Sequence, residues 1–274
     1  MMKKSRRSFL KVAGIAAIGL GAAPAMNFAA SDSHGKAQAV RAKNEEALHA
    51  HRWGMVIDTS KLTEEVADAC REACHAAHNV PDFNHEVDEE KFPNTRPVNH
   101  KQEIKWIWPE KFHYAFPYKE DEFLAEKFHD LPILVTCNHC KEAPCTKACP
   151  TQATFKREDG LVIMDYHRCI GCRFCMAACP YGARSFNYRD PRPFIAETDP
   201  DFPTRSKGVV EKCNFCAERL ALGELPHCVE ASDGAIVVGD LEDPESDIRG
   251  LLAEHYTIRR KQSYGTEPSV YYIV

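Results

Sequence analysis

The apolar positions along this chain form short strand-like runs, separated by polar and proline-containing stretches. We expect strands over residues 53–58, 131–135, 160–165, 235–240 and 269–274. Two other segments, residues 63–77 and 247–255, have helical spacing. In the first of them, the side chains expected to share one face are Val66, Ala69, Ala73 and Ala76. This mixture of short strands and helices predicts an α+β fold.

The segment 82–130 is rich in proline and aromatic residues and has no clear period. Its aromatic side chains include Trp106, Trp108, Phe112, Tyr114, Phe116 and Tyr118. Two interpretations remain open: the segment packs against the body of the protein, or it offers a surface on which a partner docks. No apolar run reaches the ~20 residues that a membrane-spanning helix needs. Any contact with a membrane is therefore expected to be made through a partner.

Two cysteine runs lie in the middle of the chain, each directly after an expected strand. The first has the spacing C-x2-C-x4-C-x3-C-P and runs from Cys137 to Pro150; the second has C-x2-C-x2-C-x3-C-P and runs from Cys169 to Pro180. The second is the ligand run of bacterial ferredoxins, and the first is the same run with one longer gap. Strand, cysteine loop, short helix and strand thus occur twice, which indicates an internal duplication.

In such runs three cysteines bind one cubane cluster and the fourth binds a neighbouring cluster. This cross-over predicts one [4Fe–4S] cluster on Cys137, Cys140, Cys145 and Cys179, and a second on Cys149, Cys169, Cys172 and Cys175. Thiolate is the soft ligand that these clusters select. Paired C-x2-C motifs also bind zinc, but two nested runs that each end in Cys-Pro are unlike zinc sites.

Composition and motifs narrow the function further. A formal net charge of −5 indicates neither a nucleic-acid surface nor an anionic-membrane surface. The chain has no G-x-S-x-G motif, no phosphate-binding glycine loop, no dinucleotide fingerprint and no His/carboxylate metal triad. Since clusters carry electrons and the protein supplies their position, we expect an electron carrier that is not an enzyme on its own.

The N-terminus carries an export signal. Residues 5–11, SRRSFLK, closely match a twin-arginine signal, and a mildly apolar segment follows over residues 12–23. We expect a signal peptide over 1–30, a linker over 31–50 and a periplasmic mature protein. The signal resemblance implies export in the folded state, so clusters assembled in the cytoplasm would be carried out intact. The alternative is an amphipathic first helix that contains two arginines.

Five cysteines remain: Cys70, Cys74, Cys213, Cys216 and Cys228. Their surroundings resemble the four-cluster electron-transfer subunits of membrane-bound oxidoreductases, such as the polysulfide, tetrathionate and dimethyl-sulfoxide reductase β subunits. The stretch from Cys213 through Gly223 and Pro226 to Cys228 is similar to the late cysteine run of that family. Ser232 stands at the expected position of its fourth cysteine.

The early run of that family resembles the stretch that ends at Cys74 and is followed by Asn-Val-Pro over 79–81, with Cys70 at the third position. The first two positions, near Glu64 and Ala67, are not cysteine. The three missing ligands would all have belonged to one cluster. The resemblance therefore implies a third cluster on Cys74, Cys213, Cys216 and Cys228, with Cys70 and Ser232 as non-ligands.

The resemblance also implies an organisation into two pseudo-symmetric ferredoxin-like units. The early half of the outer unit and the aromatic insert would occupy residues 51–130. The inner two-cluster unit would occupy 131–190, the late half of the outer unit 191–242, and a C-terminal tail 243–274.

A competing motif overlaps the early run. Cys70-x3-Cys74-His75 resembles a haem-attachment sequence with one extra residue. A c-type haem there would leave the late run without a fourth ligand, and the Asn-Val-Pro placement favours the cluster. Haem c is therefore not expected, and His75, His78 and His85 are expected to be solvated.

Within the family, the chain looks most like the periplasmic iron–sulfur subunits of the membrane complexes associated with dissimilatory sulfite reductase. This resemblance implies three kinds of partner: an integral membrane quinone-interacting subunit, a multihaem cytochrome c and further redox subunits. It implies electron flow between the menaquinone pool and sulfite or sulfate metabolism. Alternatives are the β subunit of a molybdopterin tetrathionate or polysulfide reductase, and a cluster-based sensor or structural module.

Overall fold

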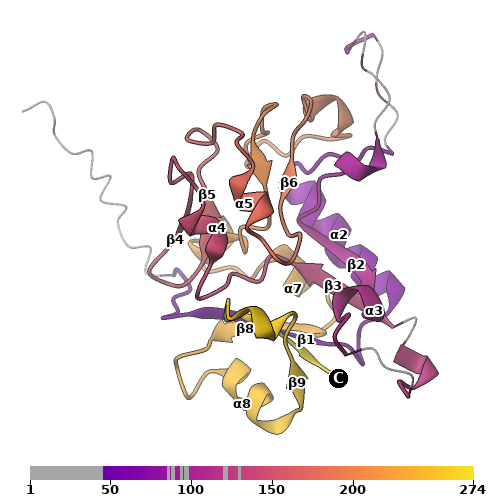
Figure 1. Ribbon diagram of the computed structural model, residues 1–274, viewed down its shortest axis with the longest axis vertical. Helices are drawn as coiled ribbons and strands as arrows, with labels where there is room; N and C mark the ends of the chain where they lie inside the picture. Colours follow the sequence, from indigo (N-terminus) through magenta and orange to yellow (C-terminus); the bar gives the residue numbers. More distant parts are fainter. Residues whose placement is uncertain are drawn as a thin grey trace, which may run out of the picture. The chain divides into compact units, whose positions relative to one another are not determined.

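The structure is a computed structural model that describes residues 46–274, apart from 85–86, 88–89, 93–94, 96–98, 120–122 and 129–130. The expected signal peptide, most of the expected linker and His85 lie outside the described residues. Figure 1 shows short strands and short helices alternating along the chain, in agreement with the predicted mixture of α and β structure.

A four-stranded sheet joins the first and last strands of the described residues. β1 (Trp53–Asp58) pairs in parallel with β10 (Val270–Ile273) and antiparallel with β8 (Ile236–Asp240). β9 (Thr257–Ile258) pairs antiparallel with the other edge of β10. The strands β1, β8 and β10 agree with the expected runs to within one residue at each end.

Both faces of this sheet are covered. Met55 and Ile57 of β1 lie in the main core with Tyr272, whereas Val56 packs against Ile248 of α8 (Asp247–Glu254). Successive side chains of a strand point to opposite faces, so a strand covered on both faces must be apolar at every position. This explains why Met55, Val56 and Ile57 of β1 are all apolar.

The helix α2 (Glu64–Ala77) is confirmed, and the face that it buries is not the face that Val66, Ala69, Ala73 and Ala76 were expected to share. Its buried residues are Ala67, Cys70 and Cys74, while Ala69 and Ala76 are exposed. Alanine is a strong helix former that is tolerated on either face, so alanine spacing gives little information about burial. The helix packs against β2 (Ile107–Lys111) and α7 (His227–Glu230).

Three two-stranded ribbons make up the rest of the strand content in the described residues. They are β2 with β3 (Pro132–Thr136), β4 (Thr154–Lys156) with β5 (Val162–Met164), and β6 (Ser185–Phe186) with β7 (Val210–Glu211). Single 3-10 turns lie at His100–Gln102, Glu126–Phe128, Arg192–Phe194 and Gln262–Tyr264.

Each inner cysteine run leads from a strand through a short helix into another strand. β3 leads through α4 (Pro144–Lys147) to β4, and β5 leads through α5 (Phe174–Ala177) to β6. The two short helices pack against each other (Figure 1). The late run follows β7 and contains α6 (Ala217–Leu220) and α7. The order of elements expected for the duplicated unit is therefore present.

Part of the aromatic insert packs into the main core. Trp106, Phe112 and Phe116 are buried, whereas Tyr114 and Tyr118 are exposed. The insert also contains β2 and a short helix α3 (Phe112–Ala115), neither of which was predicted. Proline is tolerated in strands at sheet edges, and the two-stranded ribbon gives Pro109 such a position.

Asp240, the last residue of β8, forms hydrogen bonds with the segment that leads into β1. Its carboxylate accepts hydrogen bonds from the backbone N–H groups of His51 at 2.6 Å, Arg52 at 3.0 Å and Glu242 at 2.9 Å. Burial would raise the pKa of Asp240, but these donors lower it from 3.8 to about 2. The charged form of the carboxylate is therefore part of the folded state.

We expect Asp240→Asn to lower the free energy of unfolding by about 1–3 kcal/mol. Both oxygens of the carboxylate accept hydrogen bonds from backbone N–H groups, whereas the amide would direct its own NH2 group towards one of these donors. Since the folded-state pKa is lowered, this contribution is present above about pH 4 and lost as the pH falls towards 2. Denaturant unfolding as a function of pH measures it. The exposed Glu245→Gln variant makes the same charge change and should behave as the wild type. Equal stability of the Asp240→Asn and wild-type proteins at pH 7 would contradict the assignment.

Candidate metal centres

The first inner group of cysteines consists of Cys137, Cys140, Cys145 and Cys179. All four line one small cavity, which lies between the loop after β3, α4 and the end of α5. Burial raises the pKa of the Cys140 thiol to about 12, and charge on the three neighbouring cysteines adds to this effect. Thiols crowded in this way favour a bound cation, because a coordinating thiol gives up its proton. The donor set fits a cubane cluster.

The second inner group consists of Cys149, Cys169, Cys172 and Cys175. Burial raises the pKa of Cys175; Arg184 opposes this effect, while charge on Cys145, Cys169 and Cys149 adds to it. Cys172 lies half-buried in the loop between Cys169 and Cys175. The electrostatic influence of Cys145 on Cys175 shows that the two inner groups are neighbours.

Arg184 lies between the inner groups and was missed by the sequence reasoning. Its buried guanidinium donates to Thr154 Oγ1 at 2.8 Å. Burial lowers the pKa of Arg184, but the charges of Cys145, Cys175 and Cys137 outweigh burial and raise it. A buried cation at this place offsets the negative charge that thiolates bring. The only signal in the sequence was a basic residue shortly after the second Cys-Pro.

The outer group consists of Cys74 from α2, Cys213 and Cys216 from the loop after β7, and Cys228 from α7. Burial raises the pKa of Cys74 well above 9.0, and charge on the other three cysteines raises it further. The loop turns sharply, with positive φ angles at Phe215 and Cys216. The Phe215 N–H then donates to Cys213 Sγ at 3.3 Å, as backbone amides do at iron–sulfur sites.

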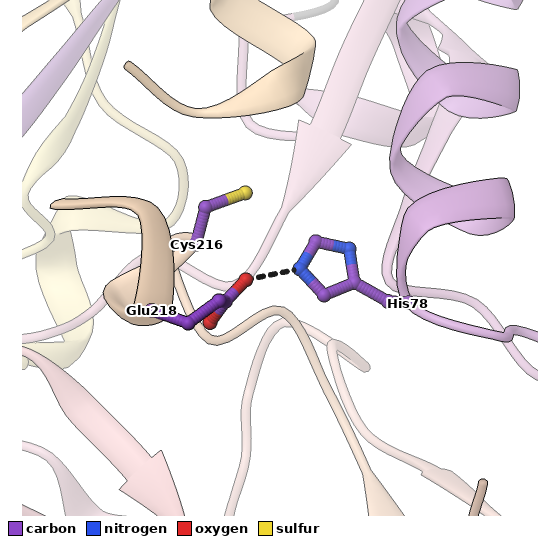
Figure 2. A group of neighbouring side chains, drawn as sticks. All are labelled: His78, Cys216 and Glu218. Carbon is purple, nitrogen blue, oxygen red and sulfur yellow. Dashed lines mark hydrogen bonds and ion pairs between the residues drawn. The ribbon is translucent and has the colours of Figure 1, made fainter. Parts of the chain in front are cut away.

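His78 and Glu218 border the outer group, so the expectation of a solvated His78 is wrong. His78 is 1% exposed, and its ring stacks on Trp106 with the ring centroids 4.7 Å apart. Its Nε2 lies 2.8 Å from Glu218 Oε1, and Figure 2 shows Cys216 beside this pair. Burial raises the pKa of Glu218, but the interactions with His78, a backbone hydrogen bond and a hydrogen bond from Asn214 together outweigh burial and lower it.

Single-ion binding at this place is a weaker fit than a cluster. One donor atom each from His78, Cys216 and Glu218 lie within 4.8 Å of one another, which would suit a divalent cation. Such an ion would leave Cys74 and Cys228 as buried thiols without a role. Four convergent thiols match the cubane donor set instead.

Cys70 and Ser232, the two predicted non-ligands, form hydrogen bonds with backbone groups. Cys70 is fully buried, and its Sγ donates to the Cys228 carbonyl at 3.2 Å. Burial raises the pKa of Cys70 to about 11. Ser232 Oγ donates to the Val229 carbonyl at 2.7 Å and accepts from the Ile236 N–H at 3.0 Å. These bonds favour structural roles for both residues.

The first turns of α2 form a regular helix, so they offer no loop that could wrap around a further cluster. Positions 64 and 67 belong to a regular helix that Thr63 caps by accepting the Val66 N–H at 3.3 Å. Ala67 is fully buried against the core. Cys70 and Cys74 are buried on the same helix, so the haem-attachment alternative has no exposed pair of thiols.

The outer group adjoins the first inner group. Burial would raise the pKa of Cys137, but the Lys212 ammonium and His139 lower it well below 9.0. The same two residues lower the pKa of Cys213 against burial, while Cys137 raises it. Lys212 Nζ donates to the Cys213 carbonyl at 2.6 Å and also to the Val162 carbonyl. Neither Lys212 nor His139 was singled out from the sequence.

Comparison with known proteins agrees with this chemistry. Residues 132–191 match the model of a family described as a 4Fe-4S dicluster domain. The chain is 37% identical over 290 residues to Hdr-like menaquinol oxidoreductase iron-sulfur subunit 1 of Archaeoglobus fulgidus, covering 98% of this chain and 97% of that protein.

Two further relatives align over most of both proteins. The menaquinone reductase iron-sulfur cluster-binding subunit of Nitratidesulfovibrio vulgaris is 33% identical over 246 residues, covering 81% of this chain and 88% of that protein. The B subunit of polysulfide reductase from Wolinella succinogenes is 32% identical over 227 residues, covering 82% and 95%. The chain therefore belongs to the family of iron–sulfur subunits that includes the polysulfide reductase B subunit and the Hdr-like menaquinol oxidoreductase subunit, and its cysteines bind [4Fe–4S] clusters.

Proposed function

We propose that this chain is an electron-transfer subunit that holds three [4Fe–4S] clusters on its three groups of four cysteines. The observation that carries the proposal is the adjacency of the groups. The helices α4 and α5, which carry Cys145 and Cys175, pack against each other, and the ring of His139, two residues after Cys137, packs against Phe215 of the late run. The second inner group, the first inner group and the outer group thus follow one another in a continuous row. Each cluster supplies one-electron chemistry when bound.

The protein's own residues bury the sulfur atoms and offset their charge. Arg184 lies between the two inner groups, and Lys212 lies where the first inner group meets the outer group. The lost ligand positions, marked by Cys70 and Ser232, lie beyond the outer group, since Cys70 contacts Cys228. Loss of a cluster there would shorten the row at one end without interrupting it.

We infer that the row connects partners on opposite sides of this subunit in a periplasm-facing membrane complex. Among the described residues, no helix is both long enough and apolar enough to cross a bilayer. The partners proposed are a membrane subunit that interacts with quinone, a multihaem cytochrome c and further redox subunits. Two relatives named for menaquinol or menaquinone support the quinone side of this assignment. The twin-arginine sequence around Arg6 and Arg7 supports the periplasmic location.

The finer proposal is that the chain has the role of DsrO, the periplasmic iron–sulfur subunit of the membrane complex associated with dissimilatory sulfite reductase. In this role it would link the menaquinone pool to dissimilatory sulfite or sulfate metabolism. It is supported by the sequence resemblance and by the reduced cysteine set. The second candidate is the β subunit of a molybdopterin-containing reductase, which the similarity to the polysulfide reductase B subunit favours. Identification of the proteins that co-purify with the chain distinguishes the two, because only the second requires a molybdopterin subunit.

We expect about twelve irons and as many acid-labile sulfides per chain in anaerobically purified protein, from three four-iron clusters. Iron and sulfide analysis, with a pyridine haemochrome assay on the same sample, measures this. The haemochrome assay should show no haem. About eight irons together with one haem would contradict the proposal and support the haem alternative at Cys70 and Cys74.

A further inference from the structure

His139 lies inside the first cysteine run but reaches towards the late run. Its backbone is left-handed, with φ of 40°, a conformation in which histidine is enriched over most residues. Ser269 Oγ donates to the His139 carbonyl at 3.1 Å and so fixes the turn. The ring is 1% exposed and meets Phe215 edge-on, with the ring centroids 5.2 Å apart. Phe215 stands between Cys213 and Cys216, so the imidazole spans the boundary between the two cysteine groups.

The hydrogen bonds of the ring define its tautomer. The Val162 backbone N–H donates to Nδ1 of His139 at 3.1 Å. A nitrogen that accepts a hydrogen bond carries no proton, so the neutral ring holds its proton on Nε2. That Nε2 is buried and has no hydrogen-bond partner among the described residues. Burial lowers the pKa of His139, but the thiols of Cys137 and Cys213 raise it, so both thiols lie close to the ring.

A buried N–H group without an oxygen or nitrogen acceptor is costly unless it has another partner. Sulfur atoms that carry ligand charge are suitable acceptors, and hydrogen bonds to cluster sulfurs influence reduction potential. Cys137 and Cys213, which belong to different groups, both lie close to the Nε2–H donor of His139. His139 is therefore placed to act on both groups at once, whereas the hydrogen bonds that the nearby Lys212 donates go to the carbonyls of Val162 and Cys213.

We propose that the Nε2–H of His139 donates to the ligand sulfur atoms of Cys137 and Cys213 and thereby sets the reduction potentials of the first inner cluster and the outer cluster. This inference rests on the proposed three-cluster function. Reduction adds negative charge to a cluster, and a hydrogen-bond donor at its sulfur stabilises that charge. The bond therefore raises both potentials relative to the cluster on Cys149, Cys169, Cys172 and Cys175. His139 is a positioning residue that tunes the relay and binds no iron.

The test compares three variants of the full chain, purified anaerobically. His139→Phe keeps a ring against Phe215 but removes both nitrogens. His139→Gln keeps an acceptor and a donor on one side chain. His167→Gln, at a fully exposed histidine close to the second inner run, is the control. Redox titration followed by electron paramagnetic resonance gives the potential of each cluster, and iron analysis is made on every sample.

In His139→Phe we expect two of the three potentials to become more negative and the third to stay unchanged. His139→Gln should lie between that variant and the wild type, and His167→Gln should match the wild type. Wild-type potentials in His139→Phe at full iron content would overturn the role of His139. Equal shifts in His139→Phe and His139→Gln would also overturn it, since they would indicate a purely steric effect.

A measurement on the wild-type protein covers the case in which His139→Phe loses its clusters. With ¹⁵N-labelled histidine, pulsed electron paramagnetic resonance should detect nitrogen coupling at two clusters. His78, whose Nδ1 lies 3.7 Å from Cys74 Sγ, accounts for coupling at the outer cluster only. Coupling at one cluster or none would therefore overturn the inference. Iron well below about twelve per chain in the wild type would instead count against the three-cluster proposal.

Discussion

Replacing Cys74 with serine should remove about four of the twelve irons, whereas replacing Cys70 with serine should remove none. Both cysteines lie on α2, one turn apart, and both are buried, with 4% and 0% exposure. The charges of Cys213, Cys216 and Cys228 all raise the pKa of Cys74, which places its thiol among them. The Cys70 thiol donates instead to a backbone carbonyl, a bond that a serine hydroxyl can also make. The pair is thus a matched test of ligand and non-ligand positions.

Iron and acid-labile sulfide analysis of the two variants measures the difference. Electron paramagnetic resonance of the reduced Cys74→Ser protein should show that the spectra of the two inner clusters are retained, because their ligands lie on other segments. Equal loss of iron in both variants would show that Cys70 is a ligand. Full iron content in Cys74→Ser would show that the outer group does not hold a cluster through this residue.

Replacing Arg205 with methionine should lower the free energy of unfolding by about 3–5 kcal/mol, because it leaves the Glu211 carboxylate as a buried charge without a cation. The two side chains form an ion pair at 2.8 Å, and both are 0% exposed. Glu211 also accepts the indole N–H of Trp106 at 3.0 Å. The pair therefore joins the insert to β7, the strand that leads into the late cysteine run.

The same change should loosen the outer cysteine group. Arg205 donates to the carbonyls of His78 and Asn79, just after the helix that carries Cys74. We expect the outer cluster to be lost first when Arg205→Met is titrated with an iron chelator, while the inner clusters persist.

Denaturant unfolding and chelator titration test this prediction against two further variants. Arg192→Met removes an exposed partner of Asp190 and should cost no more than about 1 kcal/mol. Arg205→Met combined with Glu211→Gln should recover part of the stability, because the buried charge is gone. An Arg205→Met protein as stable as Arg192→Met would contradict the role given to the buried pair.

The longer strands of the sheet were predictable because each carries its own apolar pattern. β1 is buried on both faces, and its sequence was apolar enough to indicate a short strand. The helix α2 was predictable in extent, since Thr63 and the acids after it form a start signal. Its buried face was not predictable from the alanines. The strand β2 was missed because Pro109 interrupts the apolar pattern. Pro109 is tolerated because β2 pairs only with β3, and this pairing depends on the tertiary structure.

The sequence by itself predicted the two inner groups of cysteines, because short ligand spacings are a local property and the cross-over rule pairs the runs. The outer group was predicted from the resemblance to a known family. That resemblance also singled out Cys70 and Ser232. Only the tertiary structure decided what surrounds the sulfur atoms. Arg184, Lys212, His139 and His78 come from segments whose neighbours depend on how the ribbons and α2 pack. Charge and hydrogen bonding act through space, so spacing along the chain could not reveal which of these groups meet the cysteines.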